Sequence, residues 1–235
     1  SGISHTSIHR LVGKVSTSHL EAEEKEVKEV YQAGVIPVSQ GKVVPRLFIE
    51  ADGTNIALQR EKSGRAEVKI GVAYEGWQEV SAGRYRTKEK TVYSGIMDGD
   101  RFWEGFSLAL AKKYEISQVS KIVVGGDGAH WVKEGAELLG GIYQLDRFHL
   151  SRALNRVLDY SLAQEVYQSC TRGDMAYVES VLVAEQQRSF PEQAKEVGRL
   201  RSYLLDNAFG LRDYRLIVDG DGLRGLGAIE SNVDK

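Results

Sequence analysis

Residues 121–131 read Lys-Ile-Val-Val-Gly-Gly-Asp-Gly-Ala-His-Trp, and this stretch decides the fold class. Its β-branched apolar residues predict a buried strand, its glycines end that strand, and a helical pattern begins after Asp127. In α/β folds, a carboxylate at the carboxyl end of a buried strand, beside glycines that let a ligand approach, is where the chemistry is placed. We therefore expect Asp127 to be one of three metal-binding carboxylates drawn from distant parts of the sequence.

The composition is that of an ordinary folded protein. Of the 235 residues, 42% are apolar and 27% charged, enough to bury a core as one domain or as one domain with an insertion. The net charge of -2 argues against a strongly basic nucleic-acid binder, although local basic clusters can still bind phosphate. The single cysteine, Cys170, excludes an intrachain disulfide and a cysteine-based zinc site, and favours a reducing compartment.

Targeting signals are not evident in the sequence. No apolar run approaches the roughly 18 residues that span a membrane, and the N-terminal Ser-Gly-Ile-Ser-His lacks a signal-peptide pattern. We expect a cytoplasmic location and no membrane partner. The chain lacks an initiator methionine and stops at Val-Asp-Lys within a helical pattern, so we expect it to be a piece of a longer protein.

Residues 1–34 form the first predicted unit. An apolar stripe over residues 3–15 predicts a short helix that begins at Ser4 and looks like the second helix of a helix-turn-helix. Any short capped amphipathic helix gives the same pattern. Residues 20–33, rich in Glu and Lys, predict a solvated linker helix that ends at Gly34. The side chains that would face DNA are His5, Thr6, His9 and Arg10.

Residues 35–149 are predicted to hold a sheet that begins with a meander. Leu47–Ile49 predict a first strand, residues 50–54 read as turn-like, and apolar residues resume at Ile56. Alternation over residues 68–72 predicts a second strand, and residues 85–97 a third. Short glycine-containing connections at residues 62–64 and 81–83 predict antiparallel hairpins.

Alternating elements follow. A helix capped by Asp100 precedes the strand of residues 122–124, a helix over residues 129–139 and a fifth strand over residues 142–145. Three meandering strands followed by alternating elements predict an α/β fold with a mixed sheet and helices on its faces. This is the element order of the ribonuclease H-like fold.

The last two predicted units are an insertion and a return to the sheet. Three helical stripes within residues 150–215 predict an all-helical insertion. Residues 216–218 and the glycine-rich loop of residues 219–227 predict the return of the chain to the core, so that residues 216–235 complete it with the start of a last helix.

Two aspartates are candidates for the chemistry. Asp52 follows the predicted first strand and Asp127 the predicted fourth, and in a ribonuclease H-like sheet these strands are neighbours. Paired carboxylates suit Mg²⁺, and two such ions can activate a water or a 3′-hydroxyl in phosphodiester transfer. The alternative is that Asp-Gly at residues 52–53 and 127–128 is turn chemistry alone. Glu50, on the same strand face as Asp52, is a rival ligand.

Further polar residues have weaker signals. His149 and Asp146 follow the fifth strand, where His149 would position a phosphate or a ligand, or would be a partly buried helix-capping residue. His130 is more typical of a structural hydrogen-bonding residue, and the absence of a close His pair makes zinc improbable. Glu230 opens a predicted helix, where a glutamate also favours the helix dipole without any further role.

Together these motifs resemble the Asp-Asp-Glu transposases of bacterial insertion sequences, most closely the ISLre group. The motifs are Glu-Ala-Asp-Gly-Thr at residues 50–54, Gly-Gly-Asp-Gly-Ala-His-Trp at residues 125–131, Gln-Leu-Asp-Arg-Phe-His at residues 144–149 and Gly-Ala-Ile-Glu-Ser-Asn at residues 227–232. The resemblance implies that Asp52, Asp127 and Glu230 are the catalytic triad of a ribonuclease H-like enzyme. Asp146 and His149 match the Cys/Asp-x-x-His motif of related Mutator-like enzymes.

The resemblance also implies cofactors and partners. Members of the group are expected to cut and join transposon-end DNA with two Mg²⁺ ions, for which Mn²⁺ substitutes, and to insert it into target DNA, as homodimers. Members are longer at both ends, so the resemblance implies that most of the DNA-binding domain and the rest of the last helix are missing. Only five residues follow Glu230, and such a short helix is marginal without further packing.

Two other functions remain open on the sequence. Asp-Gly-Thr at residues 52–54 and the glycine-rich loop at residues 219–227 would serve as phosphate loops in an actin-like sugar kinase or ATPase. That fold needs a second α/β half, whereas residues 150–215 predict helices. The other alternative is a non-catalytic remnant that only binds DNA or a protein.

Overall fold

A computed structural model describes residues 5–57 and 64–229, and for residues 5–18 the backbone alone. The longer elements, in chain order, are α1 (His5–Ala33), β1 (Arg46–Ala57), β2 (Arg65–Tyr74), β3 (Trp77–Ser81), β4 (Arg84–Thr87), β5 (Thr91–Gly95), α2 (Gly99–Lys113), β6 (Lys121–Gly126), α3 (His130–Leu138), β7 (Ile142–Leu145), α4 (Arg147–Val157), α5 (Tyr160–Arg172), α6 (Met175–Arg188), α7 (Pro191–Asp206) and α8 (Ala208–Leu211).

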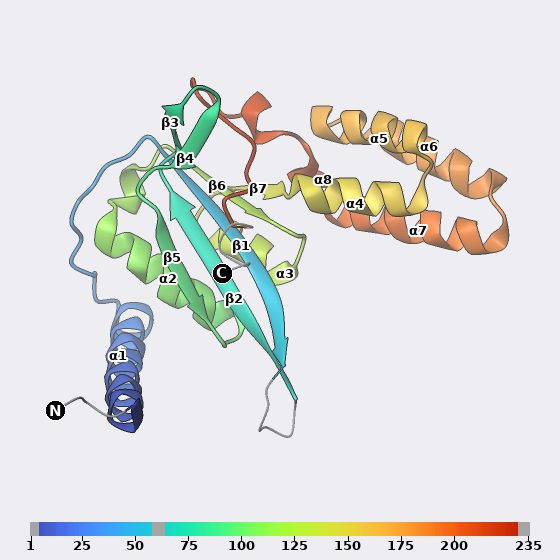
Figure 1. The fold of residues 1–235 in the computed structure, drawn as a ribbon. Helices are drawn as coiled ribbons and strands as arrows, with labels where there is room; N and C mark the ends of the chain where they lie inside the picture. The colour runs from blue at the N-terminus through green and yellow to red at the C-terminus, as the bar shows by residue number, and fades with distance from the viewer. Residues whose placement is uncertain (1–4, 58–63, 230–235) are drawn as a thin grey trace.

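The main sheet has five strands in the order β5-β2-β1-β6-β7 (Figure 1). Strand β2 is antiparallel to both β1 and β5, whereas β6 is parallel to both β1 and β7. Strand β1 is therefore the point at which the antiparallel half of the sheet meets the parallel half. A mixed α/β fold with a mixed sheet, as predicted, is confirmed.

One face of the sheet packs against α2 and α3 around the larger hydrophobic core. Two glycines allow the close approach of these layers. A Cβ atom at Gly71 of β2 would lie 2.4 Å from Cε1 of Phe106, and one at Gly135 of α3 would lie 1.9 Å from Cε2 of Trp103. The aromatic side chains of α2 therefore occupy the space that a larger side chain would need.

The opposite face carries a second, smaller core, and the C-terminal segment covers it. Phe48 of β1 stacks on Tyr74 of β2 at 5.6 Å between ring centroids, and Tyr214 meets Phe48 edge-on at 5.8 Å. Val218 and Ile229 are buried in the same cluster. The described part of the C-terminal segment therefore packs on this face of the sheet, and residues 214–216 form a 3₁₀ turn.

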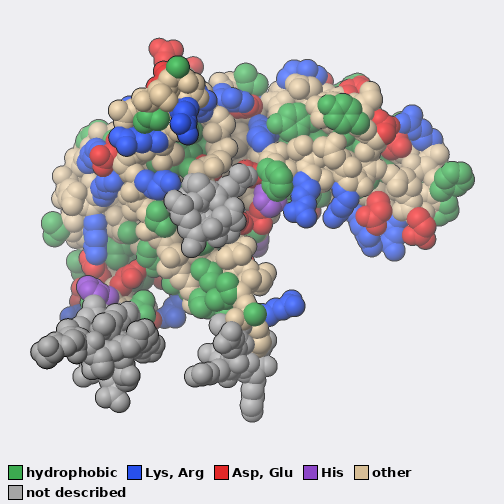
Figure 2. Space-filling model, in the orientation of Figure 1, with side chains coloured by type: hydrophobic (Ala, Val, Ile, Leu, Met, Phe, Trp, Pro, Cys, Tyr) green, Lys and Arg blue, Asp and Glu red, His purple; other side chains and the backbone are tan. Residues whose placement is uncertain are grey.

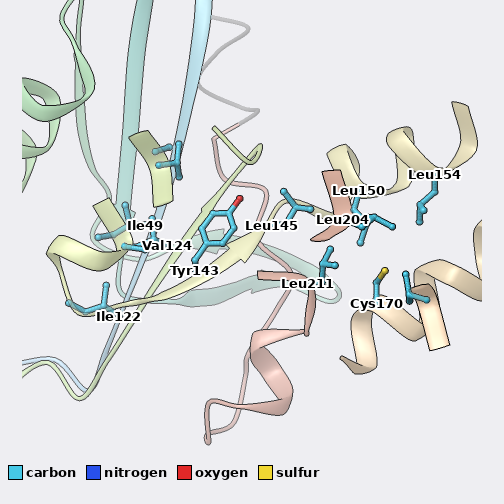
Figure 3. Close-up of a cluster of buried hydrophobic side chains, with 14 of the residues drawn as sticks. Ile49, Ile122, Val124, Tyr143, Leu145, Leu150, Leu154, Cys170, Leu204 and Leu211 are labelled. Atoms are coloured by element: carbon cyan, nitrogen blue, oxygen red, sulfur yellow. The ribbon is translucent and has the colours of Figure 1, made fainter. Parts of the chain in front are cut away.

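Helices α4 to α8 extend from the β7 edge of the sheet (Figure 1). Their interior is continuous with the larger core: Leu145 at the end of β7 is followed by Leu150 and Leu154 of α4, which belong to the same cluster as Cys170 and Leu204 (Figure 3). Residues 147–211, described in full, consist of helices and the short connections between them. The sequence patterns had not indicated α5 as a separate helix; its N-cap, Asp159, accepts a hydrogen bond from the Leu162 N–H.

Several boundary predictions were wrong. The helices expected over residues 3–15 and 20–33 form one continuous helix, α1. Helix α2 is capped by Asp98, whose side chain accepts from the Arg101 N–H, and not by Asp100. The first strand does not stop at Ile49, because the ladder with β2 continues without a break to Ala57.

The expected third strand over residues 85–97 is two strands in different sheets. Strand β4 pairs with β3 in a separate hairpin, and β5 alone joins β2. The break is at Lys88 and Glu89: Lys88 exchanges backbone hydrogen bonds with the Glu75–Gly76 bend, and Glu89 has a positive φ of 52°. Such a φ interrupts an extended ladder.

An arginine-carboxylate network joins α4 to the C-terminal segment. Asp213 accepts hydrogen bonds from the Arg215 side chain, at 2.6 Å from Nη2, and lies 3.9 Å from Nη2 of Arg147. Arg147 also donates to the Leu211 carbonyl at 2.8 Å. Burial alone would raise the pKa of Asp213, but the Arg215 hydrogen bonds and the two guanidinium charges lower this pKa below its usual value.

Within the described part of the chain, no helix combines the length and apolar character needed to cross a membrane.

The close approach at Gly71 gives a stability prediction. Gly71→Ala is expected to lower the free energy of unfolding by about 1–3 kcal/mol, because the added methyl group must displace Phe106. Gly225→Ala is the matched control, since a Cβ atom there meets nothing within 4 Å. Urea denaturation of both variants measures the difference. Equal stabilities would show that the sheet and α2 are not packed as described.

The Asp213 network gives a prediction on pH. Its folded-state pKa is lowered, so the stabilisation is present above the unfolded-state pKa, about 3.9, and is lost as the pH falls through the folded value. Asp213→Asn should reduce stability at pH 7 by about 1–3 kcal/mol, and the difference from the parent should shrink below about pH 4. Urea unfolding across pH measures it, with Asp221→Asn, at an exposed loop position, as the control. A difference that persists undiminished at low pH would contradict the assignment.

Candidate carboxylate site

Asp52 and Asp127 lie at the same edge of the sheet. The parallel ladder between β1 and β6 ends with Glu50 opposite Gly125, and each aspartate follows two residues later in its own strand direction. Side chains two apart in a strand share a face. Both aspartates line one small cavity of about 40 Å³, large enough for an ion or a water molecule. The cavity is also lined by Glu50, Asp146, His149, Leu226 and Ile229.

The two Asp-Gly pairs have different backbone settings. Asp52 and Gly53 continue the β1 ladder, opposite Ile70 and Lys69, so a turn does not explain Asp52. At Asp127 the turn interpretation does apply: Oδ1 accepts a hydrogen bond from the Ala129 N–H at 2.9 Å, and Gly128 has a φ of 102°. That bond holds the Asp127 carboxylate at the end of β6.

The electrostatics of Asp52 reflect its neighbours. Burial raises the pKa of Asp52 above its usual value, and the charges of Asp127 and Asp146 raise it further. The hydrogen bond from the Gly53 N–H, at 2.8 Å to Oδ1, and the charge of His149 act in the opposite direction. A bound cation would favour the ionised form of Asp52, which burial and the neighbouring negative charges disfavour.

Helix α4 brings Asp146 and His149 to the cavity. Asp146 is the N-cap of α4, and its Oδ1 accepts from the N–H groups of Phe148 and His149 at 2.9 and 3.0 Å. Its own N–H donates to the Gly126 carbonyl at 2.8 Å, which ties α4 to the end of β6. Asp146 thus has a capping role in addition to any role toward a ligand.

The other predicted residues are placed as follows. His130 lies outside the cavity lining: its side chain is 86% exposed, and Nε2 is 3.5 Å from Oε1 of Glu134 in the next turn. The DNA-facing candidates His5, Thr6, His9 and Arg10 lie on the α1 backbone, and their side chains lie outside the described part of the structure. Glu230 also lies outside the described residues.

Glu50 has a role that the sequence did not indicate. It is 3% exposed, and its two carboxylate oxygens accept hydrogen bonds from the N–H groups of Gly227 and Ile229, among others, each at 3.0 Å. These donors occupy the oxygens that a rival metal ligand would use. The only sequence signal was a charged residue within the apolar run of β1, which indicated a special environment but not its partner.

The donor chemistry of the cavity is compatible with Mg²⁺. Two hard carboxylates from neighbouring strands suit this ion, which takes one or two carboxylates and completes its shell with water and substrate phosphate. Each carboxylate has a second oxygen beside the one that accepts a backbone N–H. Among the described residues, no three acidic, histidine or cysteine side chains are arranged to hold a metal ion together.

Fold and site together define a class of protein: a mixed α/β domain with a helical region and two carboxylates, on neighbouring strands, that line one cavity. The model of an uncharacterised protein family, UPF0236, matches residues 1–235, and the chain belongs to this family.

Several UPF0236 proteins of Caldanaerobacter subterraneus subsp. tengcongensis are similar to the chain. One, TTE2489, is 28% identical over 189 residues, which cover 75% of this chain and 39% of that protein. A second, whose name joins four locus designations, is 28% identical over 204 residues, covering 82% of the chain and 42% of the relative. A third, whose name joins eleven locus designations, is 26% identical over 189 residues, which cover 75% of this chain and 38% of that relative. The chain thus spans about two-fifths of the length of these curated relatives.

Proposed function

We propose that the protein to which this chain belongs is an Asp-Asp-Glu DNA transposase with a ribonuclease H-like core. The observation that carries the proposal is the pair of aspartates just beyond the end of the parallel β1–β6 ladder, Asp52 within β1 and Asp127 directly after β6, which line one cavity. The sheet order, with β1 at the junction of its antiparallel and parallel halves, is the order expected for that core. The activity is the cutting and joining of transposon-end DNA and its transfer to target DNA.

The names of the relatives support the proposal that the protein is encoded by a mobile element. One relative's name joins eleven locus designations of a single organism, and another joins four. A protein encoded at many loci of one genome is what an element that moves and multiplies leaves behind.

In the proposed reaction, Asp52 and Asp127 are the metal-binding carboxylates and Glu230 is the third. Backbone N–H groups fix the first two, so their geometry does not have to reorganise when substrate arrives. His149, from the first turn of α4, lines the same cavity, and in the proposed reaction it would contact a substrate phosphate. Two bound Mg²⁺ ions, or Mn²⁺ in their place, would activate the attacking water or 3′-hydroxyl and stabilise the leaving oxygen.

Helix α4 would guide DNA toward the cavity. Arg152 and Arg156 are exposed and follow His149 by three and seven residues, which places all three on one side of the helix. The space-filling view shows a concave outline between the helical region and the sheet, with Lys and Arg side chains along the helical side (Figure 2). A basic helix face beside acidic catalytic groups suits a phosphate backbone.

The alternative functions fit less well. An actin-like phosphotransferase needs a second α/β half, and residues 147–211 are helical instead. A non-catalytic DNA-binding remnant would not need two carboxylates held at one cavity. Homodimer formation is part of the proposal for the full-length protein.

Strand cleavage tests the proposal. The full-length protein is incubated with Mg²⁺ and labelled DNA that carries the sequences flanking its own gene. Asp127→Asn should cut at least about 1,000-fold more slowly than the parent, because several kcal/mol of transition-state stabilisation are lost. The Asn side chain retains an oxygen for the Ala129 N–H, so the fold should be kept. Asp159→Asn, at the α5 N-cap, is the matched control and should cut normally. Equal cleavage by Asp127→Asn and the parent would refute the assignment.

DNA binding gives a separate prediction for α4. Ca²⁺ replaces Mg²⁺ in this experiment, so that DNA binding is measured without cleavage. The affinity for DNA should fall steeply as the salt concentration rises, because phosphate contacts release counterions. Arg152→Gln with Arg156→Gln should weaken binding and reduce the slope of log affinity against log salt by about 2. Arg188→Gln with Arg199→Gln, on α6 and α7, is the control pair. An unchanged slope would remove α4 from the DNA interface.

A further inference from the structure

An open groove lies between the β3–β4 hairpin and the C-terminal segment (Figure 1), and its volume is about 480 Å³. We call it the hairpin groove. Arg86 of β4, Lys90 just after the hairpin and Arg224 of the C-terminal segment line it, together with the aromatic side chains of Trp77 and Tyr85. Within the described part of the chain, no acidic residue belongs to this lining. Figure 2 shows Lys and Arg side chains gathered over the hairpin.

The three cations of the hairpin groove are exposed, and they have no ionic partner among the described residues. The acidic residues closest to the hairpin in sequence have other partners. Lys42 pairs with Glu75 at 2.5 Å and with Glu89 at 3.7 Å. Glu79 accepts a hydrogen bond from the Gly83 N–H at 2.9 Å. The groove is therefore a local concentration of positive charge on a chain whose net charge is -2, and such a concentration attracts an anion.

Arg224 is held in place by contacts within the protein. Its guanidinium carbon lies 3.5 Å from the centre of the Tyr85 ring, and its backbone carbonyl accepts a hydrogen bond from the Tyr214 hydroxyl. Stacking uses the face of the guanidinium, so the N–H groups at its edge remain able to donate to a ligand. Such an edge can bind two phosphate oxygens at once, and a side chain that is already ordered loses less entropy on binding.

The hairpin groove and the carboxylate cavity share one segment of the chain as a wall. Arg224, Gly225 and Gly227 line the groove, whereas Leu226 and Ile229 line the cavity. The two glycines place no side chain in the groove, so the backbone itself forms this part of its surface. A polymer of phosphates that is bound at the cavity can therefore continue into the groove.

We propose that the hairpin groove binds the phosphate backbone of a DNA strand beside the carboxylate cavity, as a surface separate from α4. Contacts of this kind position the strand and carry no sequence information. Continuity with the carboxylate cavity favours DNA over an acidic protein segment, because a strand with one phosphate at the cavity extends its neighbouring phosphates along the chain. That the ligand is DNA rests on the proposed function, whereas the affinity of the groove for an anion does not.

DNA binding by the full-length protein tests the groove. The probe is a labelled duplex with the sequences that flank its own gene, in Ca²⁺. Arg86→Gln with Lys90→Gln should weaken binding at least about tenfold and reduce the slope of log affinity against log salt by about 2, because two phosphate contacts are lost. Arg86→Lys with Lys90→Arg keeps both charges and should bind as the parent does. Arg188→Gln with Arg199→Gln is the control pair for a general loss of charge. An unchanged slope in the first variant, or an equal loss of affinity in the charge-preserving variant, would overturn the proposal.

Protection of lysines from acetylation locates the strand without any substitution. In the complex with DNA, Lys90 should react several-fold more slowly than in the free protein, whereas Lys195, exposed on α7, should react at the same rate. Equal reactivity of Lys90 in both states would contradict the placement. Protection of Lys90 by a polyglutamate peptide at lower concentrations than by DNA would also overturn the proposal, since the groove would then be a site for an acidic protein segment.

These outcomes separate the groove from the proposed function. If the protein binds DNA through the groove but does not cleave it, the groove proposal stands and the transposase activity fails. If the protein cleaves DNA while Arg86→Gln with Lys90→Gln binds as tightly as the parent, the groove proposal fails and the activity stands. A parent protein that does not bind DNA would overturn both.

Discussion

The parallel pairing of β1 with β6 is the constraint on which the rest of the structure depends. It places Asp52 of β1 beside the carboxyl end of β6, although the β2–β5 segment and α2 separate the two strands in the chain. Asp52 and Asp127 become neighbours only through this register. A shift of one residue in either strand would move one carboxylate to the opposite face, where the larger hydrophobic core lies.

Hydrogen bonds connect the helical region to the loop that carries Asp127 and to α3. The Tyr203 hydroxyl of α7 donates to the Asp127 carbonyl at 3.3 Å, and Lys133 of α3 donates to the Asp206 carbonyl at 3.0 Å. Asp146 caps α4 while it lines the cavity. The position of the Asp127 loop therefore depends on helices that follow it in sequence, and a change in their packing would reach the carboxylates.

The smaller core shows how the C-terminal segment is held on one face of the sheet. Arg46 at the start of β1 donates to the Asp219 carbonyl at 2.7 Å, and Glu50 in the middle of the same strand accepts from residues 227–229. Phe48, which lies between Arg46 and Glu50 in β1, belongs to the same apolar cluster as Tyr214 and Val218. Strand β1 thus contacts the C-terminal segment through the polar side chains of Arg46 and Glu50 and through the apolar packing of Phe48.

The sequence by itself determined the elements whose signals are local. The β-branched run at residues 122–124 predicted the strand that is β6 (Lys121–Gly126), and the switch from period two to helical stripes after residue 150 predicted the helical region. Tertiary structure decided what depends on distant partners. Strand β1 continues through Asp52 and Gly53 because β2 pairs with it to Ala57, although Asp-Gly alone favours a turn. Residues 85–97 divide because β4 and β5 find different partners. The role of Glu50 was invisible in the sequence for the same reason: a carboxylate does not reveal which N–H groups will surround it, and these lie almost 180 residues away.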